Sequence, residues 1–197
     1  MTLAISSLPT LIVSAADSRG DTLRTCLLEA GCTIVAEVRA DSTLAAQIAQ
    51  HQPGLIVLNA ASAAGKLAST VALACGEERF PLAVFTSDGS DASIDAALTA
   101  GASAYVIDGV EPARVRAVLG VALARFRQQG KLLDELSGAR TKLAERNVID
   151  RAKGILMARH KLGEDEAYAL MRKAAMDQGK KLAEVAQALV TAAELLK

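Results

Sequence analysis

Five short apolar runs, separated by stretches with helical periodicity, constrain the fold of this chain more than any other feature. Each run is too short for a helix and rich in Val, Ile and Leu, as buried strands are. The runs occupy residues 10–14, 33–38, 55–59, 82–86 and 104–107. Amphipathic helical patterns begin near Arg19, Ser42, Gly65 and Asp91. Strict alternation of strand and helix predicts an α/β domain, a doubly wound parallel five-stranded sheet with helices on both faces.

The composition predicts a folded chain without a membrane segment. Hydrophobic residues make up 51% of its 197 residues and charged residues 22%, too apolar for a disordered protein. No apolar run approaches the roughly 20 residues that span a bilayer, and no basic leader precedes the first apolar stretch. We therefore expect a cytoplasmic protein.

Cysteines and histidines give no sign of a metal or cofactor site. Cys26, Cys32 and Cys75 lack CxxC spacing, and their odd number argues against a disulfide framework. They are expected to be reduced and mostly buried. His51 and His160 lie far apart in the sequence, so we predict no metal ligands and no cofactor.

Charge is distributed unevenly along a chain whose formal net charge is +0. Residues 1–111 contain five Lys and Arg against twelve Asp and Glu, a net charge of −7. From Pro112 onward there are seventeen against ten, a net charge of +7. The second half is thus the part expected to meet a polyanion.

A long helical pattern opens at Pro112, where the missing N–H of proline costs nothing, and we predict a helical connector over residues 112–142. A partial heptad seam suggests a coiled coil, although Gly130 and Gly138 each weaken the helix by roughly 1 kcal/mol relative to alanine. The alternative is an amphipathic helix that packs on its own domain. The seam residues are Phe126, Leu133, Leu136 and Leu143.

Residues 143–197 contain three further helical patterns and predict a small all-α three-helix module. The first covers residues 146–160, and Gly163 turns the chain. The second runs to about Gln178, where Gly179 suits a left-handed cap; the third spans residues 182–196. The expected apolar stripes are Ile149, Ala152 and Leu156; Ala167, Leu170, Met171 and Ala174; and Leu182, Val185, Ala186, Leu189, Ala193 and Leu196.

The first part of the chain, residues 1–111, resembles the receiver domain of two-component response regulators, which has a flavodoxin-like fold. Residues 101–108 (GASAYVID) look like the region of the fifth strand, and residues 84–87 (VFTS) like the fourth strand with its switch threonine. In that family an aspartate accepts a phosphoryl group, an acidic pair holds magnesium and a lysine neutralises the phosphate. Such chemistry needs all three groups.

The resemblance implies a degenerate phosphorylation site here. Asn59 occupies the phosphoacceptor position and cannot form an acyl phosphate. The remaining family positions fall on Ser14 and Ala15 for the acidic pair, Thr86 for the switch and Asp108 for the lysine. Asp17 is the one candidate for a substitute carboxylate. We expect a pseudo-receiver that a partner protein controls.

The last third of the chain resembles the ANTAR RNA-binding module of transcription antiterminators. With the receiver and connector, the arrangement is similar to response regulators of the NasT and AmiR type. That resemblance implies binding to paired hairpins in a leader mRNA, dimerisation through the connector, control of nitrate or nitrite assimilation and a periplasmic-binding-protein-like sensor as partner. The matching residues are Ala152, Lys153, Gly154, Leu156, Met157, Ala167, Tyr168, Met171, Arg172 and Met176.

Charge and spacing support RNA as the ligand. Residues 140–181 contain eleven Lys and Arg against six Asp and Glu, and phosphate contacts supply most sequence-independent affinity. Tyr168 and Arg172 share a helix face, where a ring and a guanidinium suit unpaired bases. Lys153, on a face with Met157 and Lys161, is the first candidate. The predicted RNA-binding residues are Arg151, Lys153, Gly154, Met157, Tyr168, Arg172, Lys173, Lys180 and Lys181.

Other interpretations stay open. Met157, Met171 and Met176 are expected to fill the core, Tyr168 is equally suited to a half-buried core position, and the basic residues suit a solvated face. A DNA-binding response regulator is the alternative function, although the third helix has no Lys or Arg on its polar face for a major groove. A phosphoryl-transfer enzyme would need the missing carboxylates, so we predict no enzymatic activity.

Overall fold

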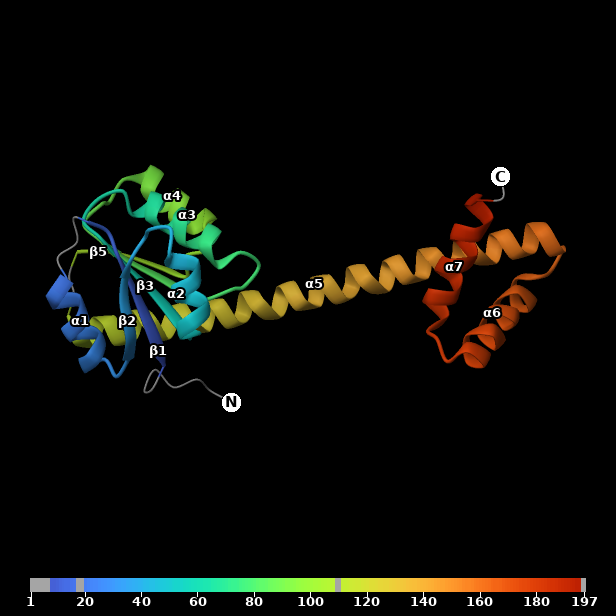
Figure 1. Cartoon of the computed structure of the whole chain (residues 1–197), viewed down its shortest axis with the longest axis horizontal. Helices are drawn as coiled ribbons and strands as arrows, with labels where there is room; N and C mark the ends of the chain where they lie inside the picture. Colours follow the sequence, from blue (N-terminus) through green and yellow to red (C-terminus); the bar gives the residue numbers. More distant parts are fainter. Residues whose placement is uncertain (1–7, 17–19, 109–110, 196–197) are drawn as a thin grey trace. The chain divides into compact units, whose positions relative to one another are not determined.

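The computed structural model describes residues 8–16, 20–108 and 111–195, and the first unit is built on a parallel five-stranded sheet (Figure 1). The strand order is β2-β1-β3-β4-β5 and every neighbouring pair is parallel, which is the doubly wound flavodoxin-like order. The predicted fold class is confirmed. The strands are β1 (Pro9–Ser14), β2 (Thr33–Arg39), β3 (Leu55–Ala60), β4 (Leu82–Thr86) and β5 (Ala104–Ile107).

Helices cover both faces of this sheet because alternate strand residues point to opposite sides. One face packs on α1 (Gly20–Glu29) and the start of α5 (Pro112–His160). The other face packs on α2 (Leu44–His51), α3 (Ala64–Cys75) and α4 (Asp91–Thr99). All six residues of β3 are buried, as a central strand of a two-sided sheet requires.

Helix α5 is continuous from Pro112 to His160 and joins two compact units, which divide between Gln129 and Gly130. Its first turns belong to the first unit, where Val115, Leu119 and Leu123 are buried in the core. The interpretation of an amphipathic helix packed on its own domain therefore applies to the start of the predicted connector. The predicted boundaries at residues 111 and 142 stay predictions.

The second unit contains the C-terminal part of α5 together with α6 (Glu164–Gln178) and α7 (Leu182–Leu195). The backbone N–H of Gly163 donates to the side chain of Glu166 at 2.9 Å and so satisfies one free group at the start of α6. Gly179 ends α6 in the left-handed region, with φ at 62°, as expected. The buried core consists of Ala152, Leu156, Ala167, Met171, Ala186 and Val190.

Two details of the expected apolar stripes differ. Leu170 is exposed, and Ala175 is buried in its place, because the buried side of α6 is narrower than the periodicity suggested. On α7 the structure adds Val190 to the core, while Leu196 lies outside the described residues.

Candidate nucleic-acid interface

Polar residues of the first unit meet where β1, β3, β4 and β5 end, at the edge that carries the phosphorylation site in receivers. Asn59 and Thr86 are each 8% exposed, and together with Asp108 they line a pocket of about 360 Å³. The carbonyl of Asn59 accepts the N–H of Ala15 at 2.8 Å. Ser14 donates to Glu37 at 3.1 Å. The five predicted positions thus gather at one edge of the sheet.

Among the described residues that line this pocket, Asp108 is the one with a charged side chain. Within the described part of the chain, the Nδ2 group of Asn59 is buried and has no hydrogen-bond partner. The Thr86 hydroxyl accepts the N–H of Asp88 at 3.0 Å. Asp108 is exposed, with a positive φ of 47°. Across the described ranges no cluster of three or more acidic, His or Cys side chains is placed to hold a metal. Asp17 lies outside the described residues.

Lys153 of the second unit lies between two carboxylates. Its Nζ donates to Oε1 of Glu164 at 2.6 Å and pairs with Oδ1 of Asp150 at 2.8 Å. Only 16% of its side chain is exposed. The hydrogen bonds to Asp150 and Glu164 raise the pKa of Lys153, and the bond from Lys153 lowers the pKa of Asp150. We call this group the α5–α6 clamp, because Asp150 and Lys153 lie on α5 and Glu164 begins α6.

Arg151 joins the other pair of helices. Its guanidinium donates to the carboxylate of Glu194 on α7, so it links α5 to α7. Both side chains remain more than half exposed, which limits the stability that the pair contributes. Two of the predicted RNA-binding cations, Arg151 and Lys153, thus have acidic partners inside the module.

A second group of cations is exposed and, within the described part of the chain, forms no ion pair. Arg172 and Lys173 lie on α6, and Lys180 and Lys181 follow it in the turn to α7. Arg159 and Lys161 at the end of α5 share this state, although the sequence analysis proposed neither as an RNA contact. We call Arg172, Lys173, Lys180 and Lys181 the α6 cations.

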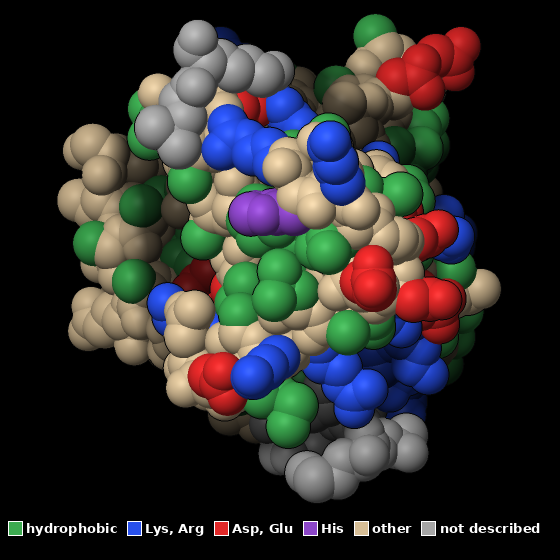
Figure 2. All heavy atoms as spheres, turned by 90° about the vertical axis from the view of Figure 1, so that its right-hand side faces the viewer, with side chains coloured by type: hydrophobic (Ala, Val, Ile, Leu, Met, Phe, Trp, Pro, Cys, Tyr) green, Lys and Arg blue, Asp and Glu red, His purple; other side chains and the backbone are tan. Residues whose placement is uncertain are grey.

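Hydrophobic side chains lie among these cations. Tyr168, Arg172 and Met176 follow one another at four-residue spacing on α6, and Tyr168 is 43% and Met176 73% exposed. Met157 is 37% exposed, whereas Met171 is buried. The expectation that all three methionines fill the core is therefore wrong for Met157 and Met176, because they lie beside the buried stripes. Figure 2 shows a face on which patches of Lys and Arg lie around hydrophobic side chains, with Asp and Glu beside them.

Gly154 is exposed, and its helix has open space beside it. Among the described residues, nothing stands within 4 Å of the position that a Cβ would take. Close approach of α6 therefore does not explain this glycine, and approach of RNA to the backbone here stays a prediction.

The acidic partners of Arg151 and Lys153 were not predicted from the sequence. The spacing of Asp150 and Lys153, three apart on a helix, was a usable signal. Glu164 and Glu194 offered none, because they lie beyond turns and only the packing of three helices brings them close. Whether each predicted residue touches RNA stays a prediction.

Comparison with known proteins matches a family model to part of the second unit and finds regulatory proteins similar to this chain. A model of the ANTAR domain matches residues 137–190. The transcriptional regulatory protein PdtaR of Mycobacterium tuberculosis is 26% identical over 165 residues, which cover 83% of this chain and 80% of PdtaR. The nitrate regulatory protein of Klebsiella oxytoca is 38% identical over 73 residues, 35% of this chain and 18% of that protein.

Solved structures with similar folds include full-length FixJ from B. japonicum, with a TM-score of 0.49 and 14% identity over 94% of this chain and 99% of FixJ. The signal receiver domain of a modulated diguanylate cyclase from Desulfovibrio desulfuricans G20 has a TM-score of 0.49 and 18% identity over 62% of this chain and 99% of that domain.

Proposed function

We propose that this chain, whose residues 137–190 match the ANTAR domain, binds hairpins in leader mRNA and prevents transcription termination. The exposed α6 cations beside Tyr168 carry this proposal. The cations provide positive charge for phosphates, and Tyr168 provides a ring for an unpaired base. All of them lie on one helix and the turn that follows it. Looped RNA is recognised in this way, by stacking and backbone contacts together.

The connector supports action as a homodimer. Leu136 and Leu143 are exposed on α5, and apolar side chains at heptad spacing favour pairing with a second helix. Two modules in one dimer engage two hairpins, and the second contact gains from the effective concentration that the first creates. Tandem hairpins are therefore the proposed target.

Control enters through the first unit. Asn59, Ser14 and Ala15 stand where the resemblance to receivers would place carboxylates, which supports binding of a partner protein as the proposed input. By its resemblance to nitrate regulators, the chain acts in the cytoplasm on an operon for nitrate or nitrite assimilation, with a ligand-sensing protein of the periplasmic-binding-protein type as partner. No helix in the described ranges is long and apolar enough to cross a bilayer.

A binding titration tests the RNA proposal. The full chain is titrated with a tandem-hairpin leader RNA, a single-hairpin RNA and duplex DNA of equal length at several salt concentrations. We expect tighter binding to the tandem RNA than to the single hairpin, and weak, strongly salt-dependent binding to DNA. A transcription assay on the same leader should show more read-through when protein is present.

Two results would overturn the proposal. Equal affinity for the RNA and the DNA would indicate binding through charge alone. Tight RNA binding without any change in read-through would separate binding from antitermination. Hydrodynamic measurement at micromolar concentration tests the dimer separately, since a strictly monomeric protein contradicts pairing through the connector.

A further inference from the structure

Lys153 lies at the centre of the ANTAR motif, yet its ammonium group is occupied by protein. Two carboxylates hold it at 2.6 and 2.8 Å, and only 16% of the side chain is exposed. An RNA phosphate would have to share this charge with Glu164 and Asp150, which already occupy two of its three N–H donors. The α6 cations require no such exchange, because they have no acidic partner among the described residues.

The clamp acts at the point where α6 begins. Glu164 is the first residue of α6, and the chain reaches it from the end of α5 through three residues, Lys161, Leu162 and Gly163. Glu166 caps the same helix end by accepting the N–H of Gly163 at 2.9 Å. Tyr168 follows Glu164 by four residues, one turn further along the same helix. The position of Glu164 therefore fixes the position of Tyr168 and, one more turn along, of Arg172.

We infer that Lys153 is a positioning residue, which holds the start of α6 on α5 and so places Tyr168 and Arg172 for RNA, and does not itself contact RNA. This inference rests on the proposed RNA-binding function. It reassigns the residue that motif and charge alone had made the first candidate for a phosphate contact. The two roles, contact with RNA and positioning of α6, predict opposite changes in RNA affinity when the acidic partners of Lys153 are removed.

The discriminating variant removes the partners of Lys153 and keeps the lysine. In Asp150→Asn/Glu164→Gln the module loses two negative charges, and Lys153 becomes available. If Lys153 contacts RNA, this variant binds RNA as tightly as wild type or more tightly. If Lys153 positions α6, the variant binds more weakly, by about tenfold, within the range of roughly 2- to 150-fold that coupled neighbours show.

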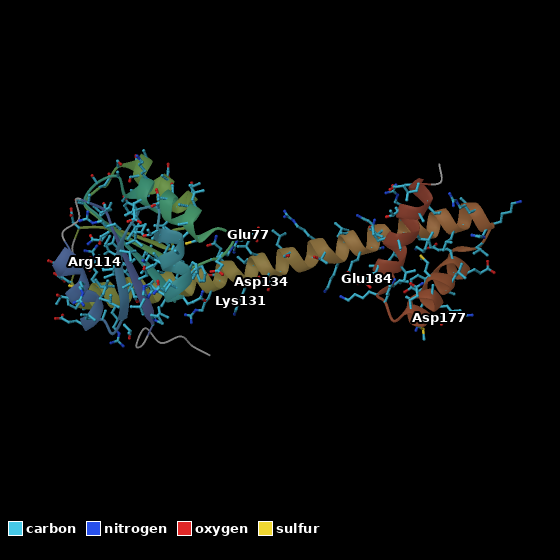
Figure 3. All side chains as sticks on the ribbon, in the orientation of Figure 1. Glu77, Arg114, Lys131, Asp134, Asp177 and Glu184 are labelled. Atoms are coloured by element: carbon cyan, nitrogen blue, oxygen red, sulfur yellow. The ribbon has the colours of Figure 1, made fainter. Side chains whose placement is uncertain are left out.

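A matched control separates this effect from charge. Asp165→Asn/Asp177→Asn makes the same change in the net charge of the helical unit, at two exposed residues of α6 without an ion pair in the described structure (Asp177 is labelled in Figure 3). Less negative charge near the α6 cations should strengthen RNA binding slightly in this control. Weakening by the first pair and not by the second identifies the clamp as the cause.

The salt dependence of binding provides a second readout. Lys153→Met retains the aliphatic stem and removes the charge, and we expect about tenfold weaker binding with an unchanged slope of log affinity against log salt. Loss of a phosphate contact would reduce that slope by roughly 0.7 to 0.9. Lys153→Arg, which offers donors to both carboxylates, should restore most of the affinity.

The outcomes distinguish the inference from the function on which it rests. A reduced salt slope in Lys153→Met, or undiminished binding by Asp150→Asn/Glu164→Gln, overturns the positioning role. Failure of wild type to prefer RNA over DNA overturns the proposed function. In that case thermal unfolding still tests the clamp: both clamp variants should lower the melting temperature of the helical unit, and the control pair should not.

Discussion

The sheet edge of the first unit and the α5–α6 region of the second both occupy positions that their families use, but they differ in what has changed. At the sheet edge, Asn59 and Ser14 stand at positions where the resemblance to receivers would place carboxylates. In the helical unit the cations are present, but Arg151 and Lys153 pair with acidic residues of the same unit. A motif position thus indicates where a side chain lies. Whether that side chain can bind a ligand depends on the residues that it already contacts.

Removal of the α6 cations should have the largest effect. The variant Arg172→Ala/Lys173→Ala/Lys180→Ala/Lys181→Ala should weaken RNA binding by on the order of 100-fold at low salt and reduce the salt slope by about 3. Each lost charge removes a phosphate contact. Filter binding or fluorescence anisotropy over a salt series measures both quantities.

The control for that variant removes four exposed cations of α5 outside the matched domain. We expect this control to bind RNA within about twofold of wild type, since affinity depends on where the charge stands. Equal losses of RNA affinity in both variants would show that the α6 cations act only through the overall charge of the protein. The four control changes are Arg114→Ala, Arg116→Ala, Arg125→Ala and Lys131→Ala, with Arg114 and Lys131 labelled in Figure 3.

Tyr168 should have the next largest effect. Stacking on a base contributes roughly 1–3 kcal/mol, so Tyr168→Ala should weaken RNA binding by about tenfold, and Tyr168→Phe by less than about twofold. Tyr168→Leu separates stacking from packing, because leucine fills a core position and offers no ring. RNA affinity like that of wild type in the leucine variant would assign Tyr168 to the core.

Much of this fold follows from periodicity, and less of the site does. The strands and helices of the first unit begin within a few residues of their predicted positions, because buried strands and helix faces repeat at short range. The alignment of Asn59, Thr86 and Asp108 at one edge also follows, since parallel strands end together. Periodicity does not give the width of the buried face of a helix. It predicted Leu170 in the core, whereas Leu170 is exposed and Ala175 is buried.

The pairing of charges could not be predicted in the same way. The Lys153–Glu164 contact spans a turn, and the Arg151–Glu194 contact crosses two helices, so both depend on tertiary packing. The motif made Lys153 the first candidate for an RNA contact, ahead of Arg172, because charge composition carries no information about neighbours. The exposed Met157 and Met176 show the same limit for hydrophobic residues.

Gly154 should show a smaller effect, with stability and affinity changing in opposite directions. Gly154→Ala adds a methyl group in open space, so the helical unit should become more stable by about 1 kcal/mol. If RNA approaches the backbone at this position, the added methyl group should weaken RNA binding severalfold. Thermal unfolding and RNA titration of the same variant measure the two effects. Gly130→Ala, which also meets nothing within 4 Å among the described residues, should gain stability and retain its RNA affinity.

A smaller change in stability is expected at acid pH. In each unit a carboxyl group has a lowered pKa, but the cause differs between the two. Lys153 holds the pKa of Asp150 below the ordinary 3.8, with Arg146 contributing, whereas hydrogen bonds from Thr43 lower the pKa of Asp41. A lowered folded pKa means that the stabilisation is present above about pH 4 and is lost as the pH falls through the folded value.

Lys153→Met should therefore raise the pKa of Asp150 and leave that of Asp41 unchanged, as measured by NMR of the carboxyl carbons. Salt should raise the pKa of Asp150 more than that of Asp41, because an ion pair is screened. A salt response of equal size at both residues would show that charge does not hold Asp150, and so would contradict the clamp.

The smallest response is expected from Asn59→Asp at the sheet edge. Restoring the acceptor carboxylate does not restore the magnesium ligands, since Ser14 and Ala15 stand in place of the acidic pair, and Asp108 adds negative charge where a cation is needed. Incubation with a small phosphodonor and magnesium should leave the variant unmodified by mass spectrometry. Robust phosphorylation would mean that other carboxylates at this edge bind the metal, and the first unit would then differ from a working receiver by one residue. In that event the first unit would have lost only its acceptor residue, and this edge would no longer support control by a partner protein.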